Sequence, residues 1–262
     1  MLEEIVRYKV QETAQRKQAH GIDALLKRIR DARAPRHFAG ALAGEGISLI
    51  AEAKYRSPSK GVLRADYDPL QLAMAYQAGG ASALSVIADS RFFGNAPHVV
   101  GMLANHPQIT LPVMYKDFIV DEYQVYEARA LGADAILMIV RCLPPGSLAR
   151  LHALANQLGL DVLVETFDEA DIDQALSVDA SIVGINNRDL DTFKVDFDRS
   201  AQLFECLPAS VIAVAESGVA GHQDMQLVER IGFAAALVGE RLLTAADPCL
   251  ESRRLLGADE AV

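Results

Sequence analysis

The chain has 262 residues, of which 51% are hydrophobic and 23% are charged, as in a folded protein with a sizeable core. Its 25 Lys and Arg residues against 35 Asp and Glu residues give a net charge of −10, which disfavours nucleic acid and anionic membranes as partners. The sequence has no apolar run of bilayer length and no secretory signal, and its three widely spaced cysteines indicate a reducing cytoplasm.

Helical patterns come first along the chain. The stretches LEEIVRYKVQETAQRKQ and GIDALLKRIRDAR are rich in good helix formers and repeat apolar residues at three- and four-residue steps. We therefore predict a helical extension over residues 1–45. At the other end, residues 251–262 are predicted to form a short helix and a frayed tail.

Eight short apolar runs follow the extension, and a helical stretch continues each of them. Apolar strands that alternate with helices indicate a parallel sheet covered by helices. Eight such units predict an α/β fold, a closed (β/α)8 TIM barrel over residues 46–250, in a single domain of residues 1–262. An open doubly wound sheet is disfavoured because no G-x-G-x-x-G loop follows the first run. The predicted strands are 48–53, 83–88, 111–115, 135–140, 161–165, 181–186, 210–216 and 235–240.

Polar residues close five of these apolar runs. In a barrel of this type the active site lies at the C-terminal ends of the strands, so we expect these residues to converge on one mouth. For any single one, emergence of the chain into water is an equally good explanation, but five coinciding strand ends favour a site. Strand alternation also places residues i and i+2 on the same side. The residues are Glu52 and Lys54, Lys116, Glu165, Asn186 and Arg188, and Glu216 and Ser217.

Short glycine-containing segments end the last two predicted strands. The segments 216–218 (ESG) and 238–240 (VGE) are each typical of a turn, but on neighbouring strands they suit backbone N–H groups that bind a phosphate. Ser57 is a turn residue or a further donor. Phe92 and Phe93 follow the second strand and are either core residues or a wall for an aromatic substrate. No group of His, Cys and carboxylates has the spacing of a metal site.

Five segments together resemble the motifs of a known family, the indole-3-glycerol phosphate synthases of tryptophan biosynthesis. They are AEAKYRSPSKG, YKDFIVDEYQVYEARALGADAILMI, LGLDVLVE, GINNRDLDTFKVD and AESGV, and they occur in the family's order and spacing. The resemblance implies a carboxy-lyase that closes the pyrrole ring of 1-(2-carboxyphenylamino)-1-deoxyribulose 5-phosphate. It also implies loss of carbon dioxide and water, no cofactor, no metal, and an N-terminal extension that folds over the mouth.

The resemblance also implies roles for individual residues. Lys116 matches the general acid that protonates the ketone, and Glu165 and Lys54 match the base and the acid of the later loss of water. Acidic neighbours keep a lysine charged, whereas a proton donor works best with a lowered pKa, and the sequence leaves this balance open. The other catalytic positions are Glu52, Asn186, Glu216 and Ser217, and the substrate or phosphate contacts are Ser57, Arg188, Gly218, Gly239, Glu240, Phe93, Phe118 and Leu190.

Two other functions stay open at this point. One is a different phosphosugar enzyme on the same barrel, such as the neighbouring isomerase of the pathway, but no strand ends in the cysteine that its chemistry needs. The other is a non-catalytic phosphosugar-binding or scaffold protein, against which Lys116 and Glu165 are both retained. We expect a monomer or a weak homodimer. The positions that depart from the family pattern are Ala53, Ala88, Phe167 and Arg241.

Overall fold

The computed structural model describes residues 2–58, 60–144, 146–188 and 195–258. Within these ranges, eight parallel strands close into a barrel because β1 (Ser48–Ala53) pairs with both β10 (Ala235–Val238) and β4 (Ala83–Ile87). This confirms the predicted fold. The other barrel strands are β5 (Val113–Lys116), β6 (Ala135–Ile139), β7 (Asp161–Thr166), β8 (Ile182–Asn186) and β9 (Ile212–Glu216).

All eight predicted strands are present, and they differ from the prediction only at their ends. The run 235–240 stops being a strand at Val238, because Glu240 already begins a helix. Val140 continues the apolar run of β6 but belongs to a short 3-10 helix, η1 (Val140–Cys142). Val140 is nevertheless buried in the core. The apolar run in the sequence therefore continues past the last residue of the strand, because the next residue is buried as well.

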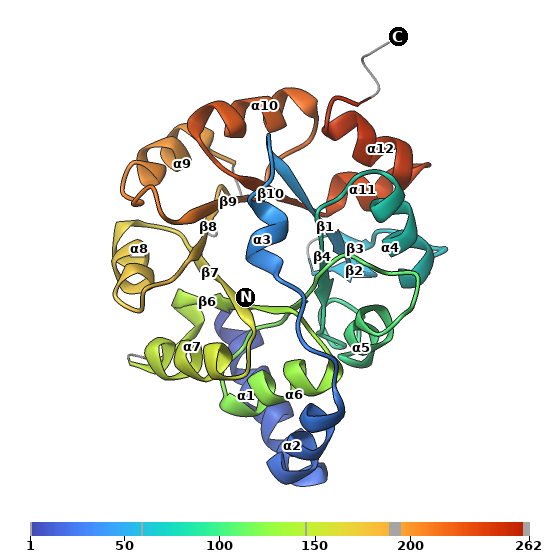
Figure 1. Cartoon of the computed structure of the whole chain (residues 1–262), viewed down its shortest axis with the longest axis vertical. Coiled ribbons are helices and arrows are strands. Elements are labelled where there is room, and N and C mark those ends of the chain that lie inside the picture. The colour runs from blue at the N-terminus through green and yellow to red at the C-terminus, as the bar shows by residue number, and fades with distance from the viewer. Residues whose placement is uncertain (1, 59, 145, 189–194, 259–262) are drawn as a thin grey trace.

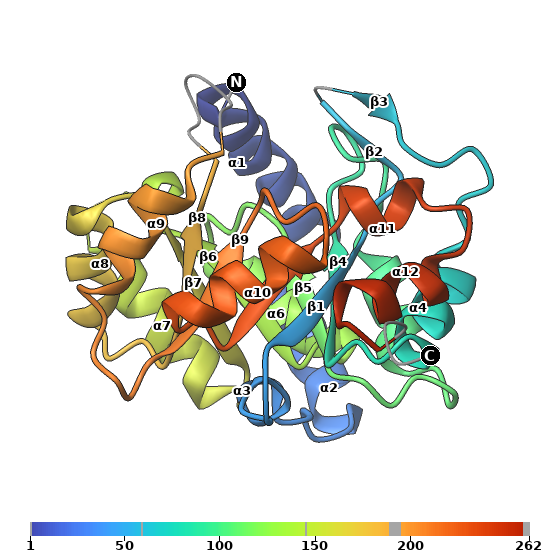
Figure 2. The ribbon, with the colours of Figure 1, turned by 90° about the horizontal axis from the view of Figure 1, so that it is seen from above.

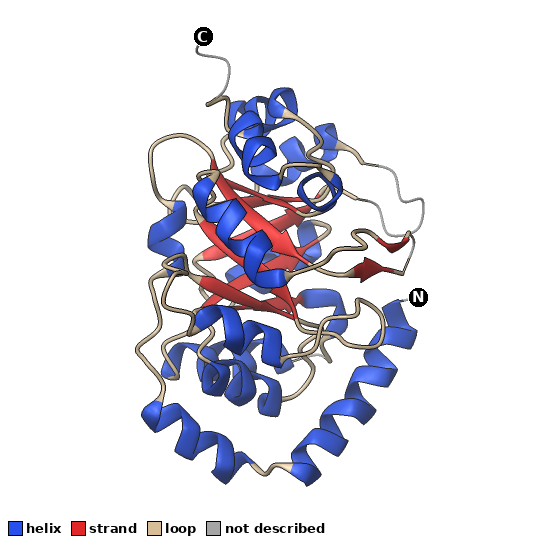
Figure 3. Cartoon of the chain, turned by 90° about the vertical axis from the view of Figure 1, so that its right-hand side faces the viewer, coloured by secondary structure: helices blue, strands red, loops and turns tan. Residues whose placement is uncertain are grey.

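Helices surround the strands on the outside of the barrel (Figure 3). A representative one is α6 (Glu122–Leu131), which begins with a capping box between Asp121 and Gln124 and ends at Gly132 in the left-handed conformation. The last helix, α12, crosses the predicted boundary at residue 250 and packs against α4. The other helices of this layer are α4 (Pro69–Ala78), α5 (His98–Ala104), α7 (Ser147–Gln157), α8 (Glu169–Leu176), α9 (Phe197–Phe204), α10 (His222–Ile231), α11 (Glu240–Thr244) and α12 (Pro248–Leu255).

The apolar core consists of an outer cluster between strands and helices and an inner cluster that fills the barrel. Helix α3 (Phe38–Leu42) lies across one end of the barrel (Figure 1). Its side chains Phe38 and Leu42 are fully buried and pack in the inner cluster with residues such as Met114 and Leu163. This end is therefore a filled floor, and a ligand reaches the barrel from the opposite end.

The N-terminal extension is helical, as predicted, and extends from the mouth of the barrel to its floor. Helix α1 (Leu2–Ala19) lies at the end opposite α3, the same end as a short hairpin of β2 (Arg56–Ser57) and β3 (Gly61–Val62) (Figure 2). Helix α2 (Ile22–Asp31) then packs along α6 towards the floor. In the described part of the chain, no helix is both long and apolar enough to cross a membrane. The division into extension, barrel and tail stays a prediction.

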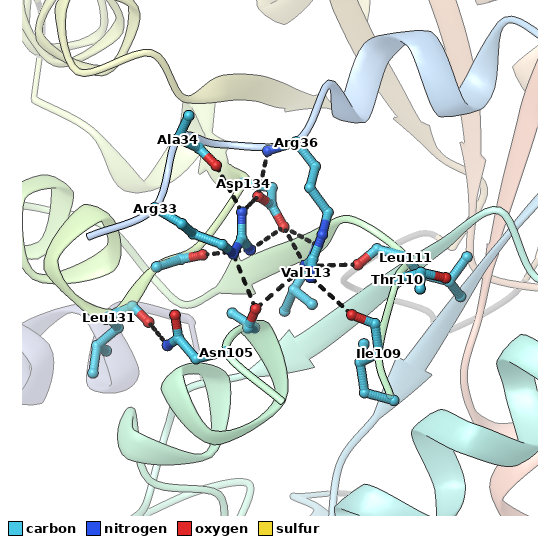
Figure 4. A network of polar contacts seen from close by, with 12 residues as sticks. Arg33, Ala34, Arg36, Asn105, Ile109, Thr110, Leu111, Val113, Leu131 and Asp134 are labelled. Carbon is cyan, nitrogen blue, oxygen red and sulfur yellow. Dashed lines mark hydrogen bonds and ion pairs between the residues drawn. The ribbon is translucent and has the colours of Figure 1, made fainter. Parts of the chain in front are cut away.

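A buried carboxylate holds the segment between α2 and α3 to the barrel (Figure 4). Asp134, which precedes β6 and is fully buried, accepts hydrogen bonds from Arg33 Nη1 and Nη2 at 2.6 and 3.0 Å. It also accepts the backbone N–H groups of Arg36 at 2.6 Å and of Val113 at 2.7 Å. The Asp134 carboxylate thus joins the extension to two adjacent barrel strands.

Replacement of this carboxylate is expected to destabilise the fold. In Asp134→Ala the two arginines and two buried N–H groups lose a common acceptor, so the free energy of unfolding should fall by about 3 kcal/mol. Urea denaturation followed by circular dichroism measures this, with the exposed Asp31→Ala as the matched control, expected within about 0.5 kcal/mol of wild type. A loss below about 1 kcal/mol for Asp134→Ala would show that the contact contributes little.

Candidate active site

Two adjoining cavities open at the mouth of the barrel. One, of about 300 Å³, has mostly apolar walls, and the other, of about 540 Å³, is lined by charged residues and by the loops after β9 and β10. Because six of the described residues line both cavities, the two meet along one shared wall. These six residues are Glu52, Lys54, Ser57, Lys116, Glu165 and Asn186.

The walls of the apolar cavity come from α1, from two rim loops and from the strands. Phe93 and Phe118 face each other on two loops, with ring centroids 6.2 Å apart, and both line the cavity. Phe92 instead packs edge-to-face against Tyr8 of α1. Phe167, one of the departures from the family pattern, also lines this cavity, and the guanidinium of Arg141 lies 4.7 Å from its ring centroid. The cavity therefore offers aromatic surfaces to a flat apolar group.

Glu52 lies between two lysines at the shared wall. Its Oε1 accepts a short hydrogen bond from Lys54 Nζ, and its Oε2 accepts one from Lys116 Nζ at 2.7 Å. Burial alone raises the pKa of a carboxyl group, but the charges of Lys116 and Lys54 hold the pKa of Glu52 at about 2. Burial likewise opposes the charge on Lys116, yet the acidic side chains beside it, above all Glu52, raise the pKa of its amine above the ordinary value. The sequence leaves open whether the pKa of this lysine is raised or lowered. In the structure the acidic neighbours outweigh burial, so Lys116 is protonated.

Glu165 and Asn186 form a second hydrogen-bonded unit of the shared wall. Asn186 Nδ2 donates to Glu165 Oε1 at 3.1 Å, and Asn186 Oδ1 accepts the backbone N–H of Arg188 at 3.0 Å. The amide thus has both its ends occupied and a fixed orientation. It links the end of β7 to the end of β8, so the carboxylate of Glu165 has a defined position.

Glu216, at the end of β9, is a buried acid beside Glu165. Burial, followed by the nearby charge of Glu165, raises the pKa of Glu216 well above its ordinary value and so favours its protonated form. A Cβ atom at Gly184 would overlap Glu216 Oε1, so the β8 position has no side chain where the acid lies. Gly184 is a site residue that our sequence interpretation missed, and the signal for it is a glycine inside a strand.

The loops after β9 and β10 contribute residues 217–220 and 239–241 to the lining of the polar cavity. Ser217 and Gly218 are both left-handed, with φ of 66° and 88°, an unusual conformation for the serine. Asn187 Nδ2 donates to the Ser217 carbonyl at 2.7 Å and holds this turn. Arg188 and Gly239 complete the lining that the sequence predicts. Leu190 lies outside the described residues.

Charged partners surround the same cavity. The Glu240 carboxylate pairs with Lys60 of the loop between β2 and β3. Arg241, another departure from the family pattern, pairs with Glu251 at 2.6 Å and also lines the cavity. In the described ranges, no three His, Cys, Asp or Glu residues are grouped so that they would hold a metal ion.

The structure brings together the predicted site residues that it describes, since each of them lines one or both cavities. Our sequence interpretation missed Asp89, which follows β4, lines the apolar cavity and has the same signal as the predicted acids: a carboxylate just after an apolar strand. It also missed the following apolar residues, which have no distinguishing local signal: Leu2, Ile5, Ile87, Leu137 and Ile139.

A family model described as indole-3-glycerol phosphate synthase matches residues 2–255. The chain belongs to the indole-3-glycerol phosphate synthase family. Indole-3-glycerol phosphate synthase 2 of Streptomyces coelicolor is 45% identical over 243 residues, which are 92% of this chain and 93% of that protein. Indole-3-glycerol phosphate synthase of Aromatoleum aromaticum is 41% identical over 261 residues, or 98% and 99% of the two chains. The predicted family and its class of enzyme are confirmed.

Solved structures with little sequence similarity share the fold. Thiamine phosphate pyrophosphorylase from Pyrococcus furiosus superposes with a TM-score of 0.61 at 15% identity, over 82% of this chain and 96% of that chain. At this identity the similarity concerns the barrel alone. The indole-3-glycerol phosphate synthase assignment therefore rests on the sequence relatives and on the family model.

Proposed function

We propose that the chain converts 1-(2-carboxyphenylamino)-1-deoxyribulose 5-phosphate to indole-3-glycerol phosphate, carbon dioxide and water. The observation that carries this proposal is the shared wall, where two lysines and two acids separate an aromatic cavity from a polar one. The substrate is divided in the same way, with a carboxylated ring at one end, a phosphate at the other, and the reacting carbons between them.

Ring closure is assigned to Lys116. The ring carbon that carries the carboxylate forms a bond to the ketone carbon, and the ketone oxygen takes up a proton. The charged amine of Lys116 supplies this proton, and its raised pKa keeps the proton in place until the oxygen gains negative charge. Carbon dioxide then leaves, and the electrons of the broken bond restore the aromatic ring. Glu52 orients both lysines through its two oxygens.

Loss of water is assigned to Lys54 and Glu165. The new hydroxyl group leaves with a proton from Lys54, and Glu165 removes a proton from the neighbouring carbon, so that the pyrrole double bond forms. Asn186 orients the Glu165 carboxylate through its amide. Glu216 is assigned the role of a proton-bearing neighbour that polarises Glu165, because burial and the charge of Glu165 favour its protonated form.

Phosphate binding is assigned to the polar cavity. Backbone N–H groups around Ser217, Gly218 and Gly239 suit an anion, and Arg188 adds a positive charge. Because the Glu240 carboxylate is paired with Lys60, its repulsion of a phosphate is reduced, and its backbone N–H is the group that we assign to the ligand.

The proposed partner is thus a phosphorylated small molecule, and we propose that the protein acts in the cytoplasm as a monomer or weak homodimer. The three cysteines are free thiols, as in proteins of reducing compartments, which supports the cytoplasmic location.

Purified protein mixed with the carboxyphenylamino ribulose phosphate tests the proposal. We expect indole fluorescence to rise with time, with one carbon dioxide released per indole formed. Tight binding by calorimetry without fluorescence or gas release would instead indicate a non-catalytic protein. Absence of both binding and turnover would contradict the substrate assignment.

A further inference from the structure

Lys9 is a fully buried lysine of α1 that the proposed chemistry does not use. Its Nζ contacts three carboxylates: Asp89 at 2.8 Å, Asp117 at 2.9 Å and Glu12 at 2.8 Å. Glu12 belongs to the same helix, whereas the two aspartates follow β4 and β5. Burial of a charged amine costs desolvation free energy, which ion pairs with carboxylates offset. The ion pairs of Lys9 join the extension to the ends of two strands at the mouth of the barrel.

Each aspartate also fixes the backbone of a rim loop. Asp89 Oδ1 accepts the backbone N–H groups of Phe92 and Phe93, at 2.6 and 3.1 Å. Asp117 Oδ1 accepts the backbone N–H of Phe118 at 2.9 Å. The same carboxylates that bind Lys9 therefore set the positions of the two facing rings of the apolar cavity.

From this geometry we infer that Lys9 is a positioning residue for the aromatic end of the substrate. Through Asp89 and Asp117 it holds Phe93 and Phe118 in the wall of the cavity that we assign to the carboxyphenyl ring. It also anchors α1, so that Leu2 and Ile5 cover the same cavity. The inference rests on the proposed function, because it assigns the ring to this cavity. Lys9 itself touches no reacting atom, so its effect is on binding of the ring.

The variant Lys9→Met keeps the length of the side chain and removes its charge. Because Lys9 positions the cavity wall and transfers no proton in the reaction, KM for the full substrate should rise at least about tenfold while kcat stays within about threefold. Ribulose 5-phosphate has the phosphate arm without the ring, and its dissociation constant by calorimetry should change less than about twofold. An unchanged KM, or equal weakening of both ligands, would overturn the inference.

The matched control is Lys17→Met, which removes an exposed lysine from the same helix and should leave both constants unchanged. If Lys9→Met fails to fold, Asp89→Asn tests the inference instead. The amide oxygen of the asparagine still accepts hydrogen bonds from the N–H groups of the loop, while the ion pair with Lys9 is lost. We expect about a threefold rise in KM for Asp89→Asn, and no rise would overturn the inference. Wild-type turnover is measured first: its absence contradicts the proposed function, whereas normal turnover with an unchanged Lys9→Met KM contradicts only the role of Lys9.

Discussion

Lys116→Ala is expected to lower kcat at least about a hundredfold while the protein stays folded, the usual scale for loss of a general acid. The change removes the cation that protonates the ketone and leaves Glu52 paired with Lys54 alone. Indole fluorescence under saturating substrate gives kcat, and far-ultraviolet circular dichroism reports whether the barrel is intact.

The control for this variant is Lys27→Ala, an exposed lysine on α2, whose kcat should match that of wild type. A folded Lys116→Ala protein with a near-normal rate would show that the ketone receives its proton from another group. Lys54 would then be the next candidate, because it lies on the other oxygen of Glu52.

Glu165→Gln should likewise reduce kcat by at least about a hundredfold. Glutamine keeps the size of the side chain and its contact with Asn186, but it does not accept a proton from the carbon next to the leaving hydroxyl group. Because the charge of Glu165 helps to raise the pKa values of Glu216 and Lys116, both should fall in this variant. The pH dependence of the residual rate measures that shift.

Glu216→Gln provides the contrast. Because the protonated form of Glu216 is favoured, an amide there resembles it in charge and in the ability to donate a hydrogen bond, and kcat should stay within about tenfold of wild type. If the two glutamine variants lose activity equally, the assignment of Glu165 as the base and Glu216 as a neutral donor is wrong.

The barrel was predictable because each of its strands is an apolar run bounded by turns, and the parallel fold follows from their alternation with helices. The candidate site was predictable for a topological reason. Parallel closure of the barrel brings the C-terminal ends of its strands together. The last or next-to-last strand residues include Glu52, Lys116, Glu165, Asn186 and Glu216. Neither step needs side-chain detail, so single-sequence patterns were sufficient for both.

Features that depend on contacts between distant segments were not predictable. In the sequence, nothing distinguishes Lys9 from the other charged residues of a mixed-charge helix. Its burial results from the packing of α1 against the residues that follow β4 and β5. The hairpin of β2 and β3 has two residues in each strand, too few for any periodicity. The raised pKa of Lys116 depends on how closely acidic side chains, above all Glu52, approach its amine, and the spacing of these residues along the chain does not predict that distance.

The carboxylate that joins the extension to the floor also sets the order in which the molecule can assemble. Arg33 leaves the ribosome 101 residues before its partner Asp134, and Lys9 is made 80 or more residues before Asp89 and Asp117. The extension can form these buried ion pairs only after the barrel strands up to β5 have been synthesised. Completion of the catalytic chamber therefore depends on contacts between residues far apart in the sequence, and such contacts slow folding.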